Sequence, residues 1–226
     1  MAGTGVGGNG SVVTFAAKQH MQRPAMTLAG GMLYVGFGSH ADTDPYHGWV
    51  LGYNATNLTL SANYIFNTTP NASSPAFPAS AFPGEGALWM GGSGLVVDAN
   101  TNLYFETANG SFSQNTNGGD YGSSFVKLST ATNKSSVADY FTPFNQAAQQ
   151  SSDADLGSGG PILLPDSVGS VAHPHLIVGA GKMGKIYLLD CDNLGQFQAG
   201  SDSQIVQSTA NSAIGGGGSS RWDSSA

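Results

Sequence analysis

Short runs in which apolar and polar residues alternate dominate this chain, and polar or glycine-rich stretches separate them. Alternation with a period of two is typical of β-strands that bury one face. The best helical pattern is short, NQAAQQSS from Asn145 to Ser152, and helical periodicity is otherwise almost absent. The pattern therefore predicts an all-β protein.

Three stretches of the chain can be superimposed, and each predicts an inner apolar strand, two alternating strands and an outer strand. The predicted strands are RPAMTLAGG, MLYVGFG, GWVLGYNA and ANYIFNTTP; GGSGLVV, LYFETANG, SSFVKLSTA and SVADYFTP; and GSGGPILL, HLIVGAG, GKIYLLDCD and SQIVQS. Equivalent strands recur about every 70 residues. Four-stranded units repeated along a chain predict the blades of a β-propeller, in which neighbouring blades bury each other's faces.

The number of predicted blades does not close a ring, because propellers typically have four to eight. The chain offers about three four-stranded antiparallel blades plus an orphan outer strand, SVVTF, at Ser11 to Phe15. We therefore expect a partial propeller that missing blades or a second copy would complete, and a β-sandwich is the alternative. Residues 1–10 and 209–226 are expected to be flexible segments that flank the blades at 11–208.

Composition supports a β-rich chain and excludes some partners. The chain has 33 glycines, only 9% charged residues and a net charge of −7, without any Lys/Arg run, which argues against a nucleic-acid surface. No apolar run approaches the roughly 20 residues that cross a bilayer.

Cys191 is the single cysteine, so no internal disulfide can form. Low charge with abundant Thr, Asn and Gly favours a secreted or periplasmic protein; MAGTGVGGNG is not a signal peptide, so a signal would lie upstream.

Three segments carry a resemblance to a known family: GMLYVGFG, GALWMGGSGLVVDANTNLYFETANG and HPHLIVGAGKMGKIYLLDCDNLG. They resemble bacterial β-propellers with pyrroloquinoline-quinone-like repeats, in which a strand leads into G-x-[IV]-Y-x-[LV]-D. GKIYLLD at Gly184 to Asp190 fits this pattern well, and the resemblance extends from Ser11 to Ser208. It implies the propeller fold, whereas members of the family differ in function.

Quinone-dependent dehydrogenases of this superfamily share a vicinal cysteine pair, a calcium-binding Glu/Asn/Asp set and tryptophan docking motifs. This chain has one cysteine, and none of its three tryptophans lies in a repeated docking motif. A quinone cofactor is therefore doubtful, and no quinone-binding residue is transferred to this chain.

In a four-stranded blade, the loop between the second and third strands emerges at the same end as the connection to the next blade. Ligand sites in propellers usually lie at that end. Here it is expected to gather His40, Asp42, Asp44, His47, Glu85, Trp89, Asp120, Asp153, Asp155 and Lys182. His173 and His175 precede a second strand, so they belong to the opposite end with the DANTN turn.

The loop GSHADTDPYHGW is a candidate metal site. His40, Asp42, Asp44 and His47 offer imidazole, which suits zinc, and carboxylates, which suit calcium. The alternative is a structural loop in which the aspartates form side-chain-to-backbone turns and His47 packs under Trp49. Asp153 and Asp155, in DADLGSGG, are weaker candidates for calcium.

Candidate catalytic and ligand-binding groups lie at the same end of the predicted blades. Glu85, Asp44 and His47 are candidate catalytic residues, and Glu106 would be a general acid or base if burial raises its pKa. The candidate ligand-binding residues are Trp49, Trp89, Asp120 and Lys182. Aromatic rings at such positions suit a small-molecule or carbohydrate ligand.

Two functions remain open. The first is a secreted or periplasmic binding or assembly module, favoured by the repeats and the lack of a strong catalytic motif. The second is a metal-assisted hydrolase or a quinoprotein-like oxidoreductase, with its site among the histidines and aspartates of the loop end.

Overall fold

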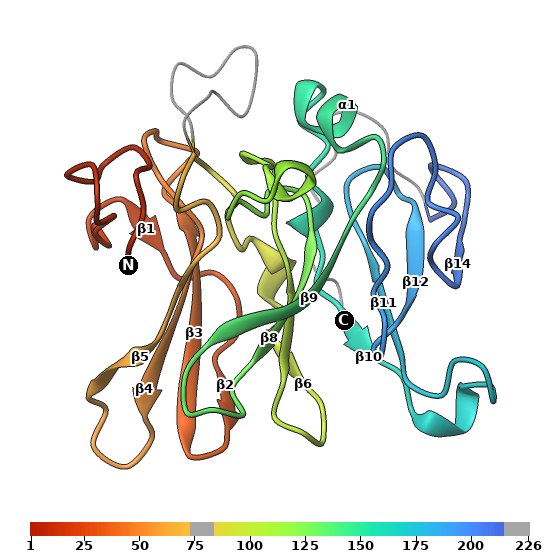
Figure 1. The fold of residues 1–226 in the computed structure, drawn as a ribbon, viewed down its shortest axis with the longest axis horizontal. Helices are drawn as coiled ribbons and strands as arrows, with labels where there is room; N and C mark the ends of the chain where they lie inside the picture. Colours follow the sequence, from red (N-terminus) through yellow and green to blue (C-terminus); the bar gives the residue numbers. More distant parts are fainter. Residues whose placement is uncertain (73–83, 215–226) are drawn as a thin grey trace.

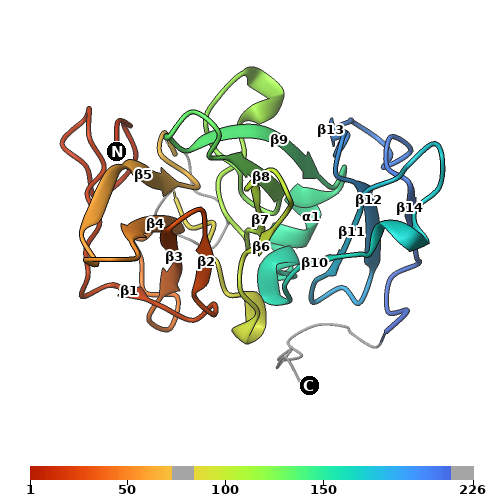
Figure 2. The ribbon, with the colours of Figure 1, turned by 90° about the horizontal axis from the view of Figure 1, so that it is seen from below.

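The computed structural model describes residues 1–72 and 84–214, and it shows three antiparallel β-sheets that stand side by side in chain order (Figures 1 and 2). We call them blade 1, blade 2 and blade 3. Blade 1 contains β2 (Thr27–Ala29), β3 (Met32–Ser39), β4 (Trp49–Asn54) and β5 (Leu60–Asn67). Blade 2 contains β6 (Val96–Val97), β7 (Leu103–Glu106), β8 (Phe125–Ser129) and β9 (Ser136–Thr142). Blade 3 contains β10 (Ile162–Leu163), β11 (Leu176–Ala180), β12 (Ile186–Asp190) and β14 (Gln207–Ser208). These are the three predicted four-stranded units.

Two short strands add to the edges of the sheets. β1 (His20–Met21) pairs antiparallel with the end of β3, and β13 (Gln196–Phe197) pairs parallel with β9. Because β13 lies between β12 and β14 of blade 3 in sequence, this pairing ties blade 3 to the outer edge of blade 2. The outer strand of blade 3 is correspondingly shorter than the predicted SQIVQS, since only Gln207–Ser208 joins β12.

Side chains that alternate along the strands fill the two interfaces between blades. Leu103 and Phe105 of β7 pack toward blade 1 with Tyr34, Val50 and Phe66. Tyr104, between them, faces blade 3. The second interface contains Tyr104, Phe125, Phe141, Leu156, Ile177, Tyr187 and Leu189. Each such buried side chain contributes about 1.5–3 kcal/mol, so stacking of the sheets supplies much of the folding energy.

The outer flank of blade 1 is covered by the N-terminal segment. Val13 is fully buried and packs with Trp49 and Leu51, and Phe15 joins them. As a result β4 is buried on both faces over its first four residues. The Ser11–Phe15 stretch, expected to be an outer strand, makes only isolated bridges, Ala2 with Val12 and Gly8 with Val13.

The outer flank of blade 3 lacks such a cover among the described residues. Tyr187 and Leu189 of β12 are buried against blade 2, whereas Ile186 and Leu188 are half-buried and point the other way. Val178 of β11 follows the same alternation, and Ile162 of β10 is 61% exposed. The two ends of the stack of blades are therefore unlike.

The remaining elements are short. α1 (Gln146–Ser151) confirms the helix expected at Asn145 to Ser152 and lies on the connection from blade 2 to blade 3. The 3₁₀ turns are η1 (Met90–Gly92), η2 (Gln114–Thr116), η3 (Leu156–Ser158) and η4 (Asp166–Val168). No helix in the described part of the chain is long and apolar enough to cross a bilayer. Most of the predicted tail lies at 215–226, outside the described residues.

Candidate functional site: the loop end of the blades

The strand order brings the expected loops to one end of the molecule. The loops at 40–48, 107–124 and 181–185 join second to third strands, and the connections between blades start and finish at the same end, which carries α1 at the top of Figure 1. We call the end that carries α1 the loop end. His173 and His175 lie at the opposite end, as the topology predicted.

A backbone seam joins blades 1 and 2 at the loop end. Glu85 N donates to Tyr46 O at 2.8 Å, and Gly48 N donates to Glu85 O at 3.1 Å. On the other side, Gly86 N donates to Asn109 O at 2.6 Å. The segment around Glu85 thus acts as an extra strand between the two loops, with Glu85 buried and in the left-handed region at φ 58°.

His47 is held on both ring nitrogens. It is 3% exposed; Nδ1 lies 2.8 Å from Thr69 Oγ1 and Nε2 lies 2.7 Å from Val6 O. Burial lowers the pKa of His47, which favours the neutral ring, with Nε2–H donating to the backbone oxygen of Val6 and Nδ1 in contact with the Thr69 hydroxyl. No ring nitrogen is left to coordinate a metal ion.

The other members of the histidine loop are not arranged as ligands. His40 and Asp42 are exposed, and Asp42 Oδ1 accepts a hydrogen bond from Tyr46 Oη at 2.9 Å. Asp44 is half-buried and precedes Pro45 through a cis peptide bond. Across the described residues, no three His, Cys, Asp or Glu side chains form a group that could hold a metal ion. The four candidate side chains are thus not gathered around one point in this structure.

The two candidate tryptophans differ in their surroundings. Trp49 is 1% exposed, stands edge-on to His47, and donates from Nε1 to His20 Nε2 at 3.1 Å. It is a core residue and offers no stacking surface to a ligand. Trp89 is half-buried, with its ring centroid 6.2 Å from that of Tyr46.

Asp120 connects the 107–124 loop to the chain that leaves blade 1. Its Oδ1 accepts from Asn71 N at 2.8 Å and its Oδ2 accepts from Ser113 Oγ at 2.9 Å. Burial raises the pKa of Asp120, and these hydrogen bonds oppose the rise. The carboxylate is thus engaged in holding the loop.

Lys182 pairs with the two candidate calcium ligands. Its Nζ lies 2.7 Å from Asp155 Oδ2 and 3.2 Å from Asp153 Oδ1, and Asp155 Oδ1 accepts from Asn109 N at 3.0 Å. Burial raises the pKa of Asp155, while the ammonium group of Lys182 opposes that rise. The contact joins blade 3 to blade 2, and the ammonium group of Lys182 is paired with both carboxylates.

The predicted residues therefore meet at one end but in separate structural contacts: the seam at Glu85, the His47 ring, the Asp120 loop and the Lys182 pair. The partners that sequence reasoning missed are Thr69 and Asn109. Their roles come from hydrogen bonds to segments that are distant in sequence, Thr69 to His47 and Glu85 and Asn109 to Asp153 and Asp155, so no local pattern marks them. Trp89 is the one candidate ligand-binding side chain with a half-exposed ring.

Replacing His47 will change the response of the protein to acid. Below about pH 6.5 the unfolded chain takes up a proton on this ring, whereas the buried ring resists, so stability falls as the pH falls. We expect His47→Gln to lower the free energy of unfolding near neutral pH by about 1–3 kcal/mol and to flatten its decline toward acid. Urea unfolding measured across that range, with the exposed-loop variant His40→Gln as control, tests this. Loss of a stoichiometric metal from His47→Gln, with unchanged acid sensitivity, would contradict it.

Comparison with known proteins identifies the fold. No family model and no curated protein sequence matches the chain. The structure resembles the quinohemoprotein alcohol dehydrogenase from Comamonas testosteroni, with 20% identity and a TM-score of 0.56 over 83% of this chain. It also resembles a europium-containing methanol dehydrogenase, with 16% identity and a TM-score of 0.57 over 84% of this chain. The matched parts are 28% and 34% of those proteins. The chain thus has the fold of part of a quinoprotein-type β-propeller, spanning about a third of such a propeller protein.

Proposed function

We propose that this partial propeller is an assembly module that binds a further blade through the outer flank of blade 3. The observation that carries the proposal is the contrast between its two outer flanks. Blade 1 is covered by residues 1–21 of the same chain, whereas blade 3 presents half-buried and exposed apolar side chains. Contiguous apolar surface of this kind marks an interaction site.

The blade 3 flank has the side-chain pattern of the two buried interfaces. The residues that form it are Ile162, Val178, Ile186 and Leu188. They project from β10, β11 and β12. The opposite faces of these three strands pack on blade 2. Another antiparallel sheet with an apolar face would cover them as blade 2 covers blade 1.

The occupant we propose is a second copy of this chain, with the blade 3 flanks of the two copies facing each other. A two-fold contact joins identical patches, and each copy offers one such patch. A head-to-tail contact would instead require the N-terminal segment to leave Trp49 and Leu51. The symmetric contact leaves that cover in place.

A charge on the flank will therefore keep the chain monomeric. We expect the wild-type protein to reach twice the monomer mass in light scattering after size exclusion at about 10–100 µM. Leu188→Lys should remain a monomer with unchanged circular dichroism, because the ammonium group would be buried without a partner. The matched control is Leu60→Lys, which charges an exposed strand residue of blade 1. A monomeric wild-type protein, or a dimer of Leu188→Lys, would refute the proposal.

Catalysis at the loop end is the second candidate, either metal-assisted hydrolysis or quinoprotein-like oxidation. It is favoured by the fold of the two dehydrogenases and by the acidic groups at that end. The engaged ring of His47 and the Lys182–Asp155 pair weigh against it. Elemental analysis and visible absorbance of the purified protein test it. Secretion is likewise proposed, on composition alone.

A further inference from the structure

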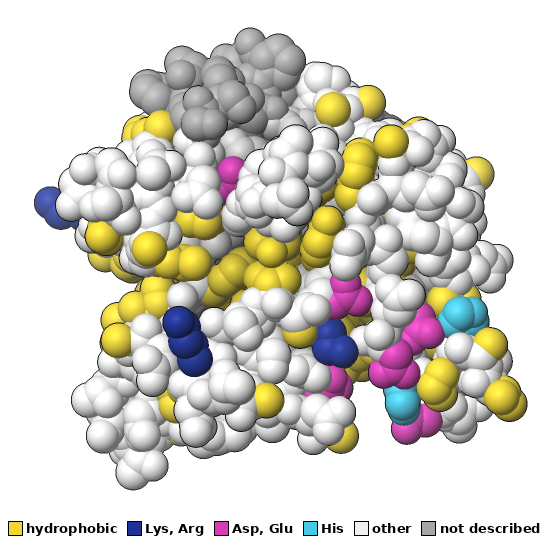
Figure 3. All heavy atoms as spheres, in the orientation of Figure 1, with side chains coloured by type: hydrophobic (Ala, Val, Ile, Leu, Met, Phe, Trp, Pro, Cys, Tyr) yellow, Lys and Arg dark blue, Asp and Glu magenta, His cyan; other side chains and the backbone are white. Residues whose placement is uncertain are grey.

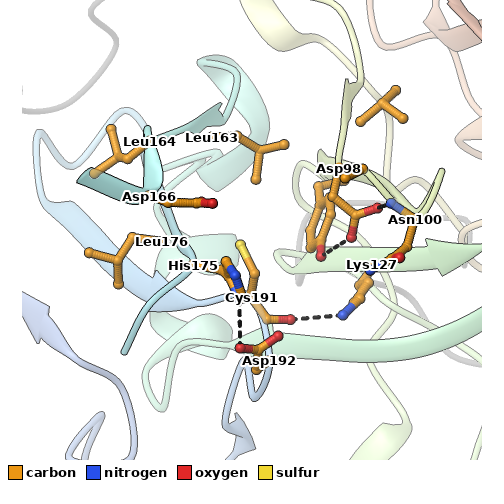
Figure 4. Close-up of a pocket in the computed structure, with 13 residues that line it drawn as sticks. Asp98, Asn100, Lys127, Leu163, Leu164, Asp166, His175, Leu176, Cys191 and Asp192 are labelled. Carbon is orange, nitrogen blue, oxygen red and sulfur yellow. Dashed lines mark hydrogen bonds and ion pairs between the residues drawn. The ribbon is translucent and has the colours of Figure 1, made fainter. Parts of the chain in front are cut away.

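A cavity of about 320 Å³ opens between blades 2 and 3 at the end opposite the loop end. Figure 4 shows side chains from both blades facing each other across it, and Figure 3 shows acidic, basic and histidine side chains gathered over this region. The cavity is a cleft that is open to solvent at the edge of the interface between blades 2 and 3. Its volume lies within the roughly 300–1,000 Å³ of small-molecule sites.

The floor of the cavity is built from Tyr104, Lys127 and Cys191. Lys127 Nζ donates to Cys191 O at 2.8 Å and lies 5.6 Å from the centre of the Tyr104 ring. Cys191 is 4% exposed, and burial raises the pKa of its thiol to about 11. The floor is thus fixed by internal contacts, and the only thiol of the chain lines it.

Three carboxylates dominate the polar lining. Burial alone would raise the pKa of Asp98, but hydrogen bonds from Asn102, Tyr104 and backbone amides hold it below its ordinary value, so Asp98 is ionised. Asp192 Oδ2 lies 2.8 Å from His175 Nδ1. The carboxylate of Asp166 makes no hydrogen bond or ion pair with any described residue. The cationic groups in the lining are the ammonium group of Lys127 and, when it is protonated, the imidazole of His175. The three carboxylates outnumber them, so the net charge of the lining is negative in both protonation states of His175.

The blade 3 side of the cavity carries most of its apolar side chains. Leu163 and Leu164 from the β10 segment and Leu176 from β11 line that side, whereas Val97 of β6 is next to Asp98 on the blade 2 side. Figure 4 shows Leu163, Leu164 and Leu176 on the side across from Asp98 and Asn100. Asp166 and Asp192 also come from blade 3, and Figure 4 shows Asp166 beside Leu164 and Leu176, across the cavity from Asp98. An occupant therefore meets carboxylates from both sides and aliphatic side chains mainly on the blade 3 side.

We propose that this cavity binds a small primary amine with an apolar body, its ammonium group lying between the carboxylates of Asp98 and Asp166 and its hydrocarbon part lying against Leu163, Leu164 and Leu176. The carboxylates do not converge as metal ligands, since no group of three such side chains in the described residues could hold an ion. An anionic ligand would meet net repulsion. The proposal does not depend on association through the blade 3 flank, because Leu163 and Ile162 face opposite sides of β10.

Cys191 provides a reporter for occupancy. Wild-type protein is treated with methyl methanethiosulfonate, and the rate of thiol modification is measured with cyclohexylamine, cyclohexanol or cyclohexanecarboxylate present. These probes share one ring and differ in their polar group. We expect cyclohexylamine to slow modification and to raise the melting temperature, cyclohexanol to do so less, and the carboxylate to do neither. Equal protection by amine and alcohol, stronger protection by the carboxylate, or no protection by the amine up to about 10 mM would overturn the proposal.

Two variants locate the effect. Asp166→Asn removes an exposed carboxylate and should weaken protection by the amine about two- to fivefold, without changing protection by the alcohol or the fold. Ala99→Trp places a bulky ring at an exposed lining position and should abolish protection by all probes. The matched control, Ala131→Trp, alters an exposed turn of the same blade that does not line the cavity. Unchanged protection of Ala99→Trp by the amine would place binding elsewhere and overturn the proposal.

Discussion

Lys182→Met will destabilise the protein by about 3 kcal/mol near neutral pH, because it leaves the carboxylate of Asp155 buried without its ammonium partner. The side chain of Asp155 is 8% exposed, and that of Lys182 is 19% exposed. Asp155 keeps its hydrogen bond from Asn109 N, which cannot replace a full positive charge 2.7 Å away. Chemical denaturation of the variant measures the loss directly.

The pH dependence identifies the cause of that loss. The folded-state pKa of Asp155 is already raised by burial, and removing Lys182 raises it further. Above about pH 4 the unfolded chain releases this proton more readily than the folded protein, so stability falls as the pH rises. The deficit of Lys182→Met should therefore shrink toward pH 4, and Lys182→Met combined with Asp155→Asn should recover most of it. Lys134→Met, in an exposed turn, is the control. A deficit that is independent of pH would contradict the buried-charge explanation.

Glu106→Met will stabilise the protein by about 1–3 kcal/mol near neutral pH, since it removes a buried carboxyl group that has no compensating partner. Glu106 is fully buried, and neither carboxyl oxygen has a hydrogen-bond partner among the described residues. It lies between blades 2 and 3, where a methyl group on Gly179 would overlap Glu106 Oε1 and the Phe125 ring. Methionine has a similar volume and no polar oxygen.

The gain from Glu106→Met should grow with pH. Burial raises the pKa of Glu106 in the folded protein well above its ordinary value. Above about pH 4.3 this carboxyl group therefore loses its proton in the unfolded chain but keeps it in the folded protein. The free energy of unfolding of the wild type consequently falls as the pH rises. Glu106→Gln removes the ionisation but keeps a buried polar group, so it should remove the pH-dependent part only. Thermal unfolding of the three proteins at several pH values tests this. If Glu106→Met is less stable than wild type at every pH, a partner for the carboxyl group exists and the explanation is wrong.

The fold was largely predictable because its signal is local. Alternation in MLYVGFG, SSFVKLSTA and GKIYLLD reports one buried face per strand, and the glycine-rich starts of the blades separate the units. The short outer strand of blade 3 was not predictable, since Ile205 in SQIVQS packs on the blade 2–blade 3 core instead of extending the sheet.

The chemistry of the loop end was only partly predictable. Topology placed the candidate residues at one end, but their partners lie far away in sequence: 22 residues separate His47 from Thr69, and 41 separate it from Val6. A pattern of histidines and aspartates does not reveal whether they face one another or separate backbone groups. The cavity escaped prediction for the same reason, because Lys127 and Cys191 meet only after blades 2 and 3 pack.

The central claim is that, among residues 1–72 and 84–214, one flank of the stacked blades is covered and the other is open. Hydroxyl-radical footprinting read out by mass spectrometry compares the two flanks directly, through Leu51 of blade 1 and Leu188 of blade 3. In dilute, monomeric protein we predict rapid labelling of Leu188 and slow labelling of Leu51, which is 2% exposed; at concentrations where the chain associates, Leu188 should become as protected as Leu51. Equal labelling of the two leucines in the monomer, or undiminished labelling of Leu188 in the associated form, would contradict the account.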